Sequence, residues 1–236
     1  TADSDNREVL EAIIPALAGS GKLFLQTSGS SIVGDMSAGE PTDEVYEDDT
    51  PVRPLPGRAA RVAINEFVLA AANDGVRAVV ICPTMIYGQG HGVHRESIQI
   101  PWFIGQAKKH GIARHIGRGE NIWSNVDIDD LMDLYLLILD RAPAGALYYA
   151  ENGENSMREI CEAISRMLGF EGRTAPMSVE QAAEESSAGA ANYTYGSNSR
   201  VRATRARCEL GWSPSRPSLL EHIERVLAHV RRLEQS

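Results

Sequence analysis

Hydrophobic and polar positions follow two spacings in the first ninety residues of the chain. Apolar residues recur at helical intervals over 5–18 and 58–73, which predicts two amphipathic helices. Short continuous apolar runs at 23–25 and 75–83 predict buried strands, and Pro83 ends the second. Alternation of helix and strand is typical of right-handed crossovers and a parallel sheet. The pattern therefore predicts an α/β fold.

After residue 87 the pattern becomes less regular. A glycine-rich stretch at 88–94 predicts a mobile loop, and residues 171–198, rich in small and polar side chains, are expected to be partly mobile. Short strands are predicted within 121–130 and at 146–150. Helices are predicted at 98–110, 131–139, 157–168 and 218–233. Asp129 or Asp130 is expected to cap the second of these helices, and Ser156 with Glu159 the third.

The two strands of the first ninety residues end in segments that can carry chemistry. In an open parallel sheet, ligands bind beyond the carboxyl ends of the strands. The first strand runs into the hydroxyl-rich segment 27–31, Thr-Ser-Gly-Ser-Ser, and the second into Pro-Thr-Met-Ile-Tyr-Gly at 83–88. We therefore expect a binding site where these two segments meet.

Composition narrows the class of partner. A net charge of −9 argues against nucleic acid and against an anionic membrane surface. Cys82, Cys161 and Cys208 are far apart and form no metal-ligand spacing, so a disulfide framework and a structural zinc site are not expected. No apolar run reaches the length of a membrane span, and the polar start is not a signal peptide. The composition is that of a reduced, cytoplasmic protein.

Four segments, in order, resemble one family. They are the hydroxyl-rich strand end that leads into Ile32-Val-Gly-Asp, Cys82-Pro-Thr-Met-Ile-Tyr-Gly, Trp123-Ser-Asn-Val-Asp-Ile-Asp-Asp-Leu, and Leu210-Gly-Trp-Ser-Pro. Similar segments, at similar spacing, mark the extended short-chain dehydrogenases of the NAD-dependent epimerase/dehydratase family. The resemblance implies a Rossmann-like parallel sheet, an NAD or NADP cofactor, and hydride transfer on a small polar or sugar-like substrate.

The chain departs from the family pattern in two ways. The glycine-rich GxxGxxG loop after a first strand is absent, so we expect a leading βαβ block of about 80 to 100 residues to be missing from this chain. The YxxxK pair that moves a proton is also absent. If Glu66 matches the acidic residue that follows this pair in many members, its Tyr position falls near Arg58 and its Lys position near Val62. The family's Ser/Thr position falls on Gly29.

The resemblance, together with the strand ends, assigns candidate roles. The candidates for catalysis are Ser28, Ser30, Arg58 and Arg61. The candidates for contact with the cofactor are Thr27, Ser28, Gly29, Pro83, Thr84, Met85 and Ile86. The candidates for contact with substrate are Tyr87, His91, Trp123, Asn125, Tyr193 and Arg200, with Tyr87 either a replacement acid/base or a pocket wall. No metal ligand is assigned, because Asp127, Asp129 and Asp130 suit helix capping better.

The predicted organisation has two parts. Residues 1–90 form the second part of a Rossmann-like dinucleotide-binding domain, and residues 91–236 form mostly a substrate-binding region, with 121–140 returning to the core. The predicted function is that of an NAD(P)-dependent oxidoreductase or epimerase with an atypical proton relay through Ser28 or Ser30. Two alternatives stay open: a non-catalytic binding or regulatory protein, and a non-redox isomerase or lyase. A small-molecule substrate and a homodimer are the expected partners.

Overall fold

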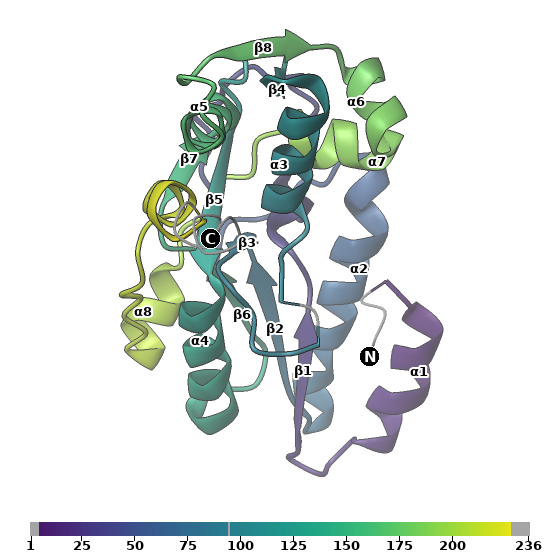
Figure 1. Ribbon diagram of the computed structural model, residues 1–236. Helices are drawn as coiled ribbons and strands as arrows, with labels where there is room; N and C mark the ends of the chain where they lie inside the picture. Colours follow the sequence, from purple (N-terminus) through teal and green to yellow (C-terminus); the bar gives the residue numbers. More distant parts are fainter. Residues whose placement is uncertain (1–4, 94, 228–236) are drawn as a thin grey trace.

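Three parallel strands form the central sheet of the protein. A computed structural model describes residues 5–93 and 95–227. In it, β1 (Leu23–Thr27), β2 (Arg77–Pro83) and β6 (Ala146–Ala150) pair in the order β1-β2-β6. All three point the same way, and their carboxyl ends reach one edge of the sheet (Figure 1). The predicted α/β class and parallel sheet are confirmed.

Helices cover both faces of this sheet. On one face lie α1 (Arg7–Ala16) and α2 (Pro56–Ala70), and on the other lie α4 (Ile128–Arg141) and α8 (Thr204–Leu210) (Figure 1). The central strand β2 supplies residues to both cores, Val80 and Cys82 to the first and Val79 and Ile81 to the second. A strand buried on both faces must be apolar at every position, which explains its continuous hydrophobic sequence.

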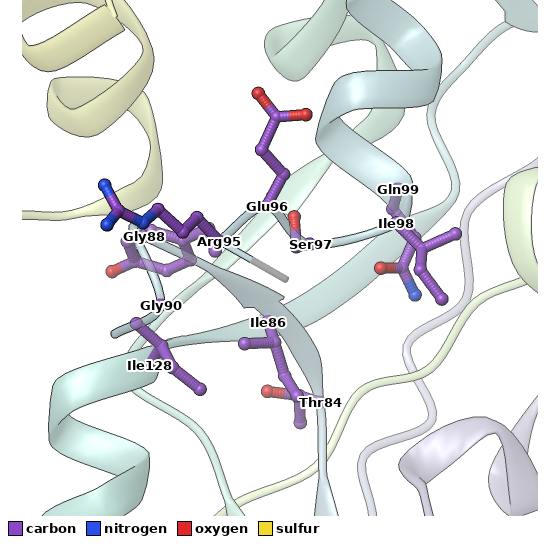
Figure 2. Close-up of a pocket in the computed structure, with 11 residues that line it drawn as sticks. Thr84, Ile86, Gly88, Gly90, Arg95, Glu96, Ser97, Ile98, Gln99 and Ile128 are labelled. Atoms are coloured by element: carbon purple, nitrogen blue, oxygen red, sulfur yellow. The ribbon is translucent and has the colours of Figure 1, made fainter. Parts of the chain in front are cut away.

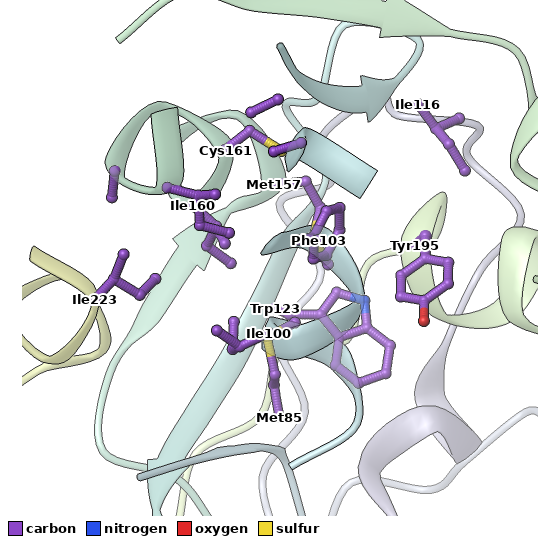
Figure 3. Packing of buried hydrophobic residues seen from close by; sticks show 14 of the residues in the cluster. Met85, Ile100, Phe103, Ile116, Trp123, Met157, Ile160, Cys161, Tyr195 and Ile223 are labelled. Carbon is purple, nitrogen blue, oxygen red and sulfur yellow. The ribbon is translucent and has the colours of Figure 1, made fainter. Parts of the chain in front are cut away.

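A second group of elements packs above the carboxyl edge of the sheet. Its strands are β3 (Met85–Tyr87), β4 (Ala113–Ile116), β5 (Ile122–Asp127), β7 (Glu154–Ser156) and β8 (Thr174–Met177). Its helices are α3 (Gln99–His110), α5 (Met157–Met167), α6 (Val179–Glu185) and α7 (Ala188–Ala190). These elements share a third core around Phe103, Trp123 and Met157 (Figure 3). Short helical turns complete the fold: η1 (Ser30–Val33), η2 (Ala71–Asp74), η3 (Ala191–Tyr195), α9 (Leu219–Glu221) and η4 (His222–Leu227).

The segment 171–198 is more ordered than its composition predicts. It forms β8, α6, α7 and η3, and Ala182, Ala191 and Tyr195 are buried in the third core. Ser178 and Gln181 form a capping box at the start of α6. Regular elements thus occupy a segment whose composition predicted partial mobility, because Ala182 and Ala191 pack into the third core.

Two helix ends differ from the sequence prediction. Asp127 caps α4 by accepting a hydrogen bond from the amide of Asp129, so neither Asp129 nor Asp130 is the cap. At α5, Ser156 and Glu159 form the expected capping box. The final helix is described as far as residue 227, and the rest of its predicted range lies outside the described residues. None of the described helices is long and apolar enough to cross a bilayer.

Asp130 is buried and ties the segment after α8 to the start of α4. Its carboxylate accepts hydrogen bonds from the amides of Ser215 (2.9 Å) and Arg216 (3.1 Å), and its carbonyl accepts one from the indole of Trp212 (2.8 Å). Replacing Asp130 by Asn turns one acceptor into a donor that faces a backbone N–H. We expect Asp130→Asn to lower the free energy of unfolding by about 1–3 kcal/mol, measured by urea denaturation.

Asp133 provides the matched control for this substitution. It is an exposed carboxylate on the same helix, and Asp133→Asn should leave the urea midpoint unchanged. Equal midpoints for both variants would mean that the Asp130 contacts contribute nothing to stability.

Candidate functional site

A cleft of about 480 Å³ opens at the carboxyl ends of β1 and β2. It brings together segments that are far apart in the sequence: the hydroxyl-rich end of β1, the start of α2, the end of β2, β5, α7 and η3. Its lining comprises Thr27, Ser28, Gly29, Ser30, Ser31, Arg58, Arg61, Pro83, Thr84, Ile86, Gln99, Trp123, Gly189, Ala190 and Thr194. The two strand-end segments do meet at one site, as expected from the parallel sheet.

The hydroxyl groups in this cleft differ in what they already bind. Ser28 Oγ is buried and has no hydrogen-bonding oxygen or nitrogen partner among the described residues. Ser30 Oγ, in contrast, lies 2.9 Å from Ser199 Oγ and is fully buried. Thr27 Oγ1 lies 2.7 Å from the phenol of Tyr135. Since a buried polar atom without a partner is costly, Ser28 is the hydroxyl best prepared to bind a ligand.

Two arginines project from the first turns of α2, with different partners. Arg61 forms a two-pronged ion pair with Asp5, at 2.7 and 2.5 Å. Arg58 forms no hydrogen bond or ion pair within residues 5–93 and 95–227, and its Nε atom is buried without a partner. Its guanidinium lies 4.6 Å from the ring centre of Tyr193.

The charge of Arg58 is poorly compensated. Burial lowers its pKa, and the nearby Arg61 charge lowers it further. It still stays protonated at neutral pH, because the guanidinium pKa lies far above that range. The helix does not compensate the charge of Arg58 either, because the first turn of α2 contains no acidic residue and has no side-chain cap. The amino-terminal end of a helix carries partial positive charge, so a cation there is unfavourable and an anion is favoured.

A second pocket, of about 310 Å³, adjoins the cleft and shares Thr84, Ile86 and Gln99 with it. Figure 2 shows Thr84, Ile86 and Ile128 on one side of this pocket, with Glu96 and Ser97 on the other. Both hollows thus lie against the segment that follows β2.

Tyr87 lines the second pocket but is not an accessible acid or base. It is 1% exposed, and its phenol donates a hydrogen bond to the carbonyl of Pro217 at 2.8 Å. Burial raises its pKa, and the charges of Asp127 and Asp130 raise it further. Of the two roles considered from the sequence, the geometry favours a pocket wall.

Several candidate residues lie outside the cleft. Met85 is buried in the third core (Figure 3), between the cleft residues Thr84 and Ile86. Asn125 donates a hydrogen bond to the side chain of Asn155 at 3.0 Å. Arg200 forms an ion pair with Glu154 at 2.7 Å, and the exposed His91 pairs with Asp129 at 2.9 Å. Tyr193 does not line the cleft, although it contacts Arg58, which does.

The sequence prediction missed two parts of the lining. Gln99 begins α3, and the segment around Gly189, Ala190 and Thr194 closes one side of the cleft. That segment belongs to the region expected to be mobile. The capping-box pair Ser178 and Gln181 is the sequence signal that predicts order there.

Comparison with known proteins identifies the family. Residues 4–150 match the model of the NAD dependent epimerase/dehydratase family. The chain belongs to this family, and the predicted family and Rossmann-like fold are confirmed. The family's description is that of NAD-dependent enzymes, in agreement with the predicted class of protein.

Relatives of known sequence are longer than this chain. Oxidase ucsJ of Acremonium sp is 30% identical over 233 residues, and the match covers 85% of this chain and 66% of the oxidase. An uncharacterized protein of Saccharomyces cerevisiae is 27% identical, with 92% of this chain and 68% of that protein covered. The chain therefore spans about two thirds of the length of the curated relatives it matches.

Solved structures share the fold at low sequence identity. A dTDP-glucose 4,6-dehydratase from Bacillus anthracis, in complex with NAD, is 16% identical with a TM-score of 0.67, over 95% of this chain and 67% of that one. A UDP-glucuronic acid 4-epimerase variant from Bacillus cereus, in complex with UDP-4-deoxy-4-fluoro-glucuronic acid and NAD, is 16% identical with a TM-score of 0.70, over 96% and 67%.

Cys82 lies beneath the cleft and provides a probe of its floor. Burial raises the pKa of this thiol to about 12, although the neighbouring Ser28 side chain opposes part of the increase. Burial also raises the pKa of the Cys161 thiol, whereas Cys208 is exposed. Because the thiolate is the reactive form, we expect only Cys208 to react rapidly with a disulfide reagent at pH 8. The measurement is absorbance of the released thiolate.

Unfolding in guanidinium should expose the two slow thiols to the same reagent. A Cys208→Ser variant is the control, and it should lose the rapid phase. A rapid phase that persists in this variant would show that Cys82 or Cys161 is open to solvent, which would contradict the burial of these two thiols.

Proposed function

We propose that the protein is an NAD(P)-dependent oxidoreductase or epimerase-like enzyme that acts on a small polar or sugar-like substrate by hydride transfer. The observation that carries this proposal is the cleft at the parallel strand ends, in a chain of the epimerase/dehydratase family, with a Ser28 hydroxyl that has no oxygen or nitrogen partner among the described residues. The solved relatives that share the fold are named as complexes with NAD, and one also holds a nucleotide-sugar analogue, which supports this class of ligand.

The described residues suit the nicotinamide end of such a cofactor. Thr27, Ser28, Gly29, Pro83 and Thr84 line the cleft through strand-end backbone and short side chains, which leave room for a flat ring. We propose these residues and Ile86 as its contacts. Bound there, a nicotinamide dinucleotide would supply a hydride acceptor or donor. The part of the chain that the structure describes contains no strand–glycine turn–helix unit to hold the phosphates.

The residues of the cleft can support the proton side of the reaction without YxxxK. When an alcohol is oxidised, its carbon loses a hydride and its oxygen loses a proton, and a carbonyl forms. Ser28 can hold the reacting oxygen by a hydrogen bond, and the positive charge of Arg58 favours the negative charge that develops on that oxygen, whereas the charge of Arg61 is compensated by Asp5. A nearby cation also lowers the pKa of the alcohol, so that the proton can leave to water in the open cleft.

Ser30 is a weaker candidate for direct contact with substrate. Its hydroxyl already pairs with Ser199, and Ser199 Oγ also donates to the Ser30 carbonyl at 2.9 Å. In our proposal this pair orients the turn that carries Ser28. The substrate side of the cleft is completed by Trp123, whose indole N–H donates to the Ser197 carbonyl at 2.8 Å and is thereby fixed in place.

Two other functions remain as alternatives. The absence of YxxxK favours a non-catalytic binding or regulatory protein on the same fold. A non-redox isomerase or lyase would use the same cleft without net electron transfer. Binding of dinucleotide without turnover would support the first alternative, and turnover with no dependence on dinucleotide would support the second.

Cofactor titration tests the proposed function. We expect NADH or NADPH to raise the melting temperature of the protein and to quench tryptophan fluorescence, because Trp123 lines the cleft. Absence of any response to both dinucleotides would overturn the proposal.

Substitution of Ser28 tests its catalytic role. We expect Ser28→Ala to lower kcat/KM for a carbonyl or sugar-nucleotide substrate by about 10²-fold, because it removes the hydrogen bond to the reacting oxygen. Ser20→Ala, at an exposed site before β1, is the matched control. An unchanged kcat/KM in Ser28→Ala would exclude this serine from the relay.

A further inference from the structure

The start of α2 carries a positive charge, that of Arg58, which forms no ion pair with a carboxylate among the described residues, although the Asp5 charge is near enough to act on it. Arg58 lies at the wall of the cleft, half-buried, in the helix turn where positive charge is least favourable. Asp5 is engaged by the neighbouring Arg61 in a two-pronged pair. A desolvated cation without a partner lowers stability, and such a cost is offset when a ligand supplies the anion.

Tyr193 holds this guanidinium from the side. Its ring centre lies 4.6 Å from the Arg58 Cζ atom, within the range of a cation–π contact. A contact of this kind fixes the position of the guanidinium without neutralising its charge. The N–H groups at the rim of the guanidinium plane therefore stay available to a ligand.

Gly57 makes this contact sterically possible. A Cβ atom at this position would lie 2.5 Å from Tyr193 Oη and 2.7 Å from Cζ, which is closer than atoms can approach. Any larger residue would push the tyrosine ring away from its place beside Arg58. The position of the Tyr193 ring beside Arg58 thus depends on the absence of a side chain at Gly57.

We infer that Arg58, held by Tyr193, is an oxyanion subsite of the cleft, and that the substrate carries a permanent carboxylate or phosphate group that this guanidinium binds. The inference rests on the proposed function, because it assigns a substrate class to the same cleft. A planar guanidinium offers paired N–H donors that match both groups. Ser31 and Thr194, which also line the cleft, supply further hydroxyl groups near its mouth. Tyr193 is a positioning residue in this arrangement.

Oxyanion binding can be measured without cofactor, so its result is separate from that of the cofactor titration. Inorganic phosphate and malonate are the probes, followed by tryptophan fluorescence and by thermal shift. Glycerol at equal concentration controls for uncharged solute. We expect one or both anions to bind and Arg58→Gln to weaken the binding by about tenfold or more. The preferred anion distinguishes a phosphate-bearing from a carboxylate-bearing substrate.

Tyr193 variants separate positioning from packing. Tyr193→Phe keeps the aromatic face, and we expect it to bind the anion as the unsubstituted protein does. Tyr193→Leu removes that face and should weaken binding several-fold. Gly57→Ala should also weaken anion binding several-fold. Because alanine favours a helix over glycine by about 1 kcal/mol, we do not expect the melting temperature of this variant to fall in parallel with its anion affinity. If Gly57 and Tyr193 acted on stability alone, anion affinity and melting temperature would change together.

Arg7 provides the matched control. Its guanidinium also lies over an aromatic ring, that of Phe67 at 4.3 Å, but it is on α1, outside the cleft. Arg7→Gln should leave anion affinity unchanged. The inference is overturned if neither anion binds the unsubstituted protein, or if Arg58→Gln and Arg7→Gln bind the anion equally well. Cofactor binding with no anion binding would overturn this inference while leaving the proposed function intact.

Discussion

The parallel pairing of β1 with β2, and of β2 with β6, is the constraint on which the rest of the structure depends. Parallel strands bring their carboxyl ends to one edge, and here the hydrogen bonding continues past the strands. The Ser28 amide donates to Ile81 at 2.8 Å, and the Thr84 amide donates to Ala150 at 3.3 Å. These bonds fix the backbone on both sides of the cleft. They allow residues from distant parts of the sequence to form one site.

The proposed chemistry at the carboxyl edge of the sheet depends on the residues that stand in place of the family's YxxxK pair. If Glu66 matches the acidic residue that follows this pair in many members, the tyrosine position falls near Arg58, a group that cannot give up its proton at neutral pH. The site therefore combines fixed positive charge with the neutral hydroxyl of Ser28 rather than a titrating phenol. In our proposal, such a site acts through electrostatic stabilisation of negative charge. Tyr193, which holds Arg58, comes from η3, an element distant in sequence.

Local signals in the sequence predicted the fold well and the site in part. The continuous apolar sequence of β2 and the hydroxyl patch after β1 are local features, and both lie where the pattern placed them. Met85 was predicted to contact the cofactor together with its neighbours Thr84 and Ile86. Successive residues of a strand face opposite sides, however, so Met85 points into the core. The Arg58–Tyr193 contact joins residues more than a hundred positions apart, and no local pattern encodes such a contact.

A crystal structure of the protein with bound NAD tests the central claim most directly, because the claim concerns where the reacting groups meet. The account predicts density for the nicotinamide ring in the cleft, against Pro83 and Thr84, with Ser28 Oγ facing the position of the transferred hydride. A dinucleotide bound elsewhere on the protein, or a cleft closed to the ring in the presence of saturating NAD, would contradict it.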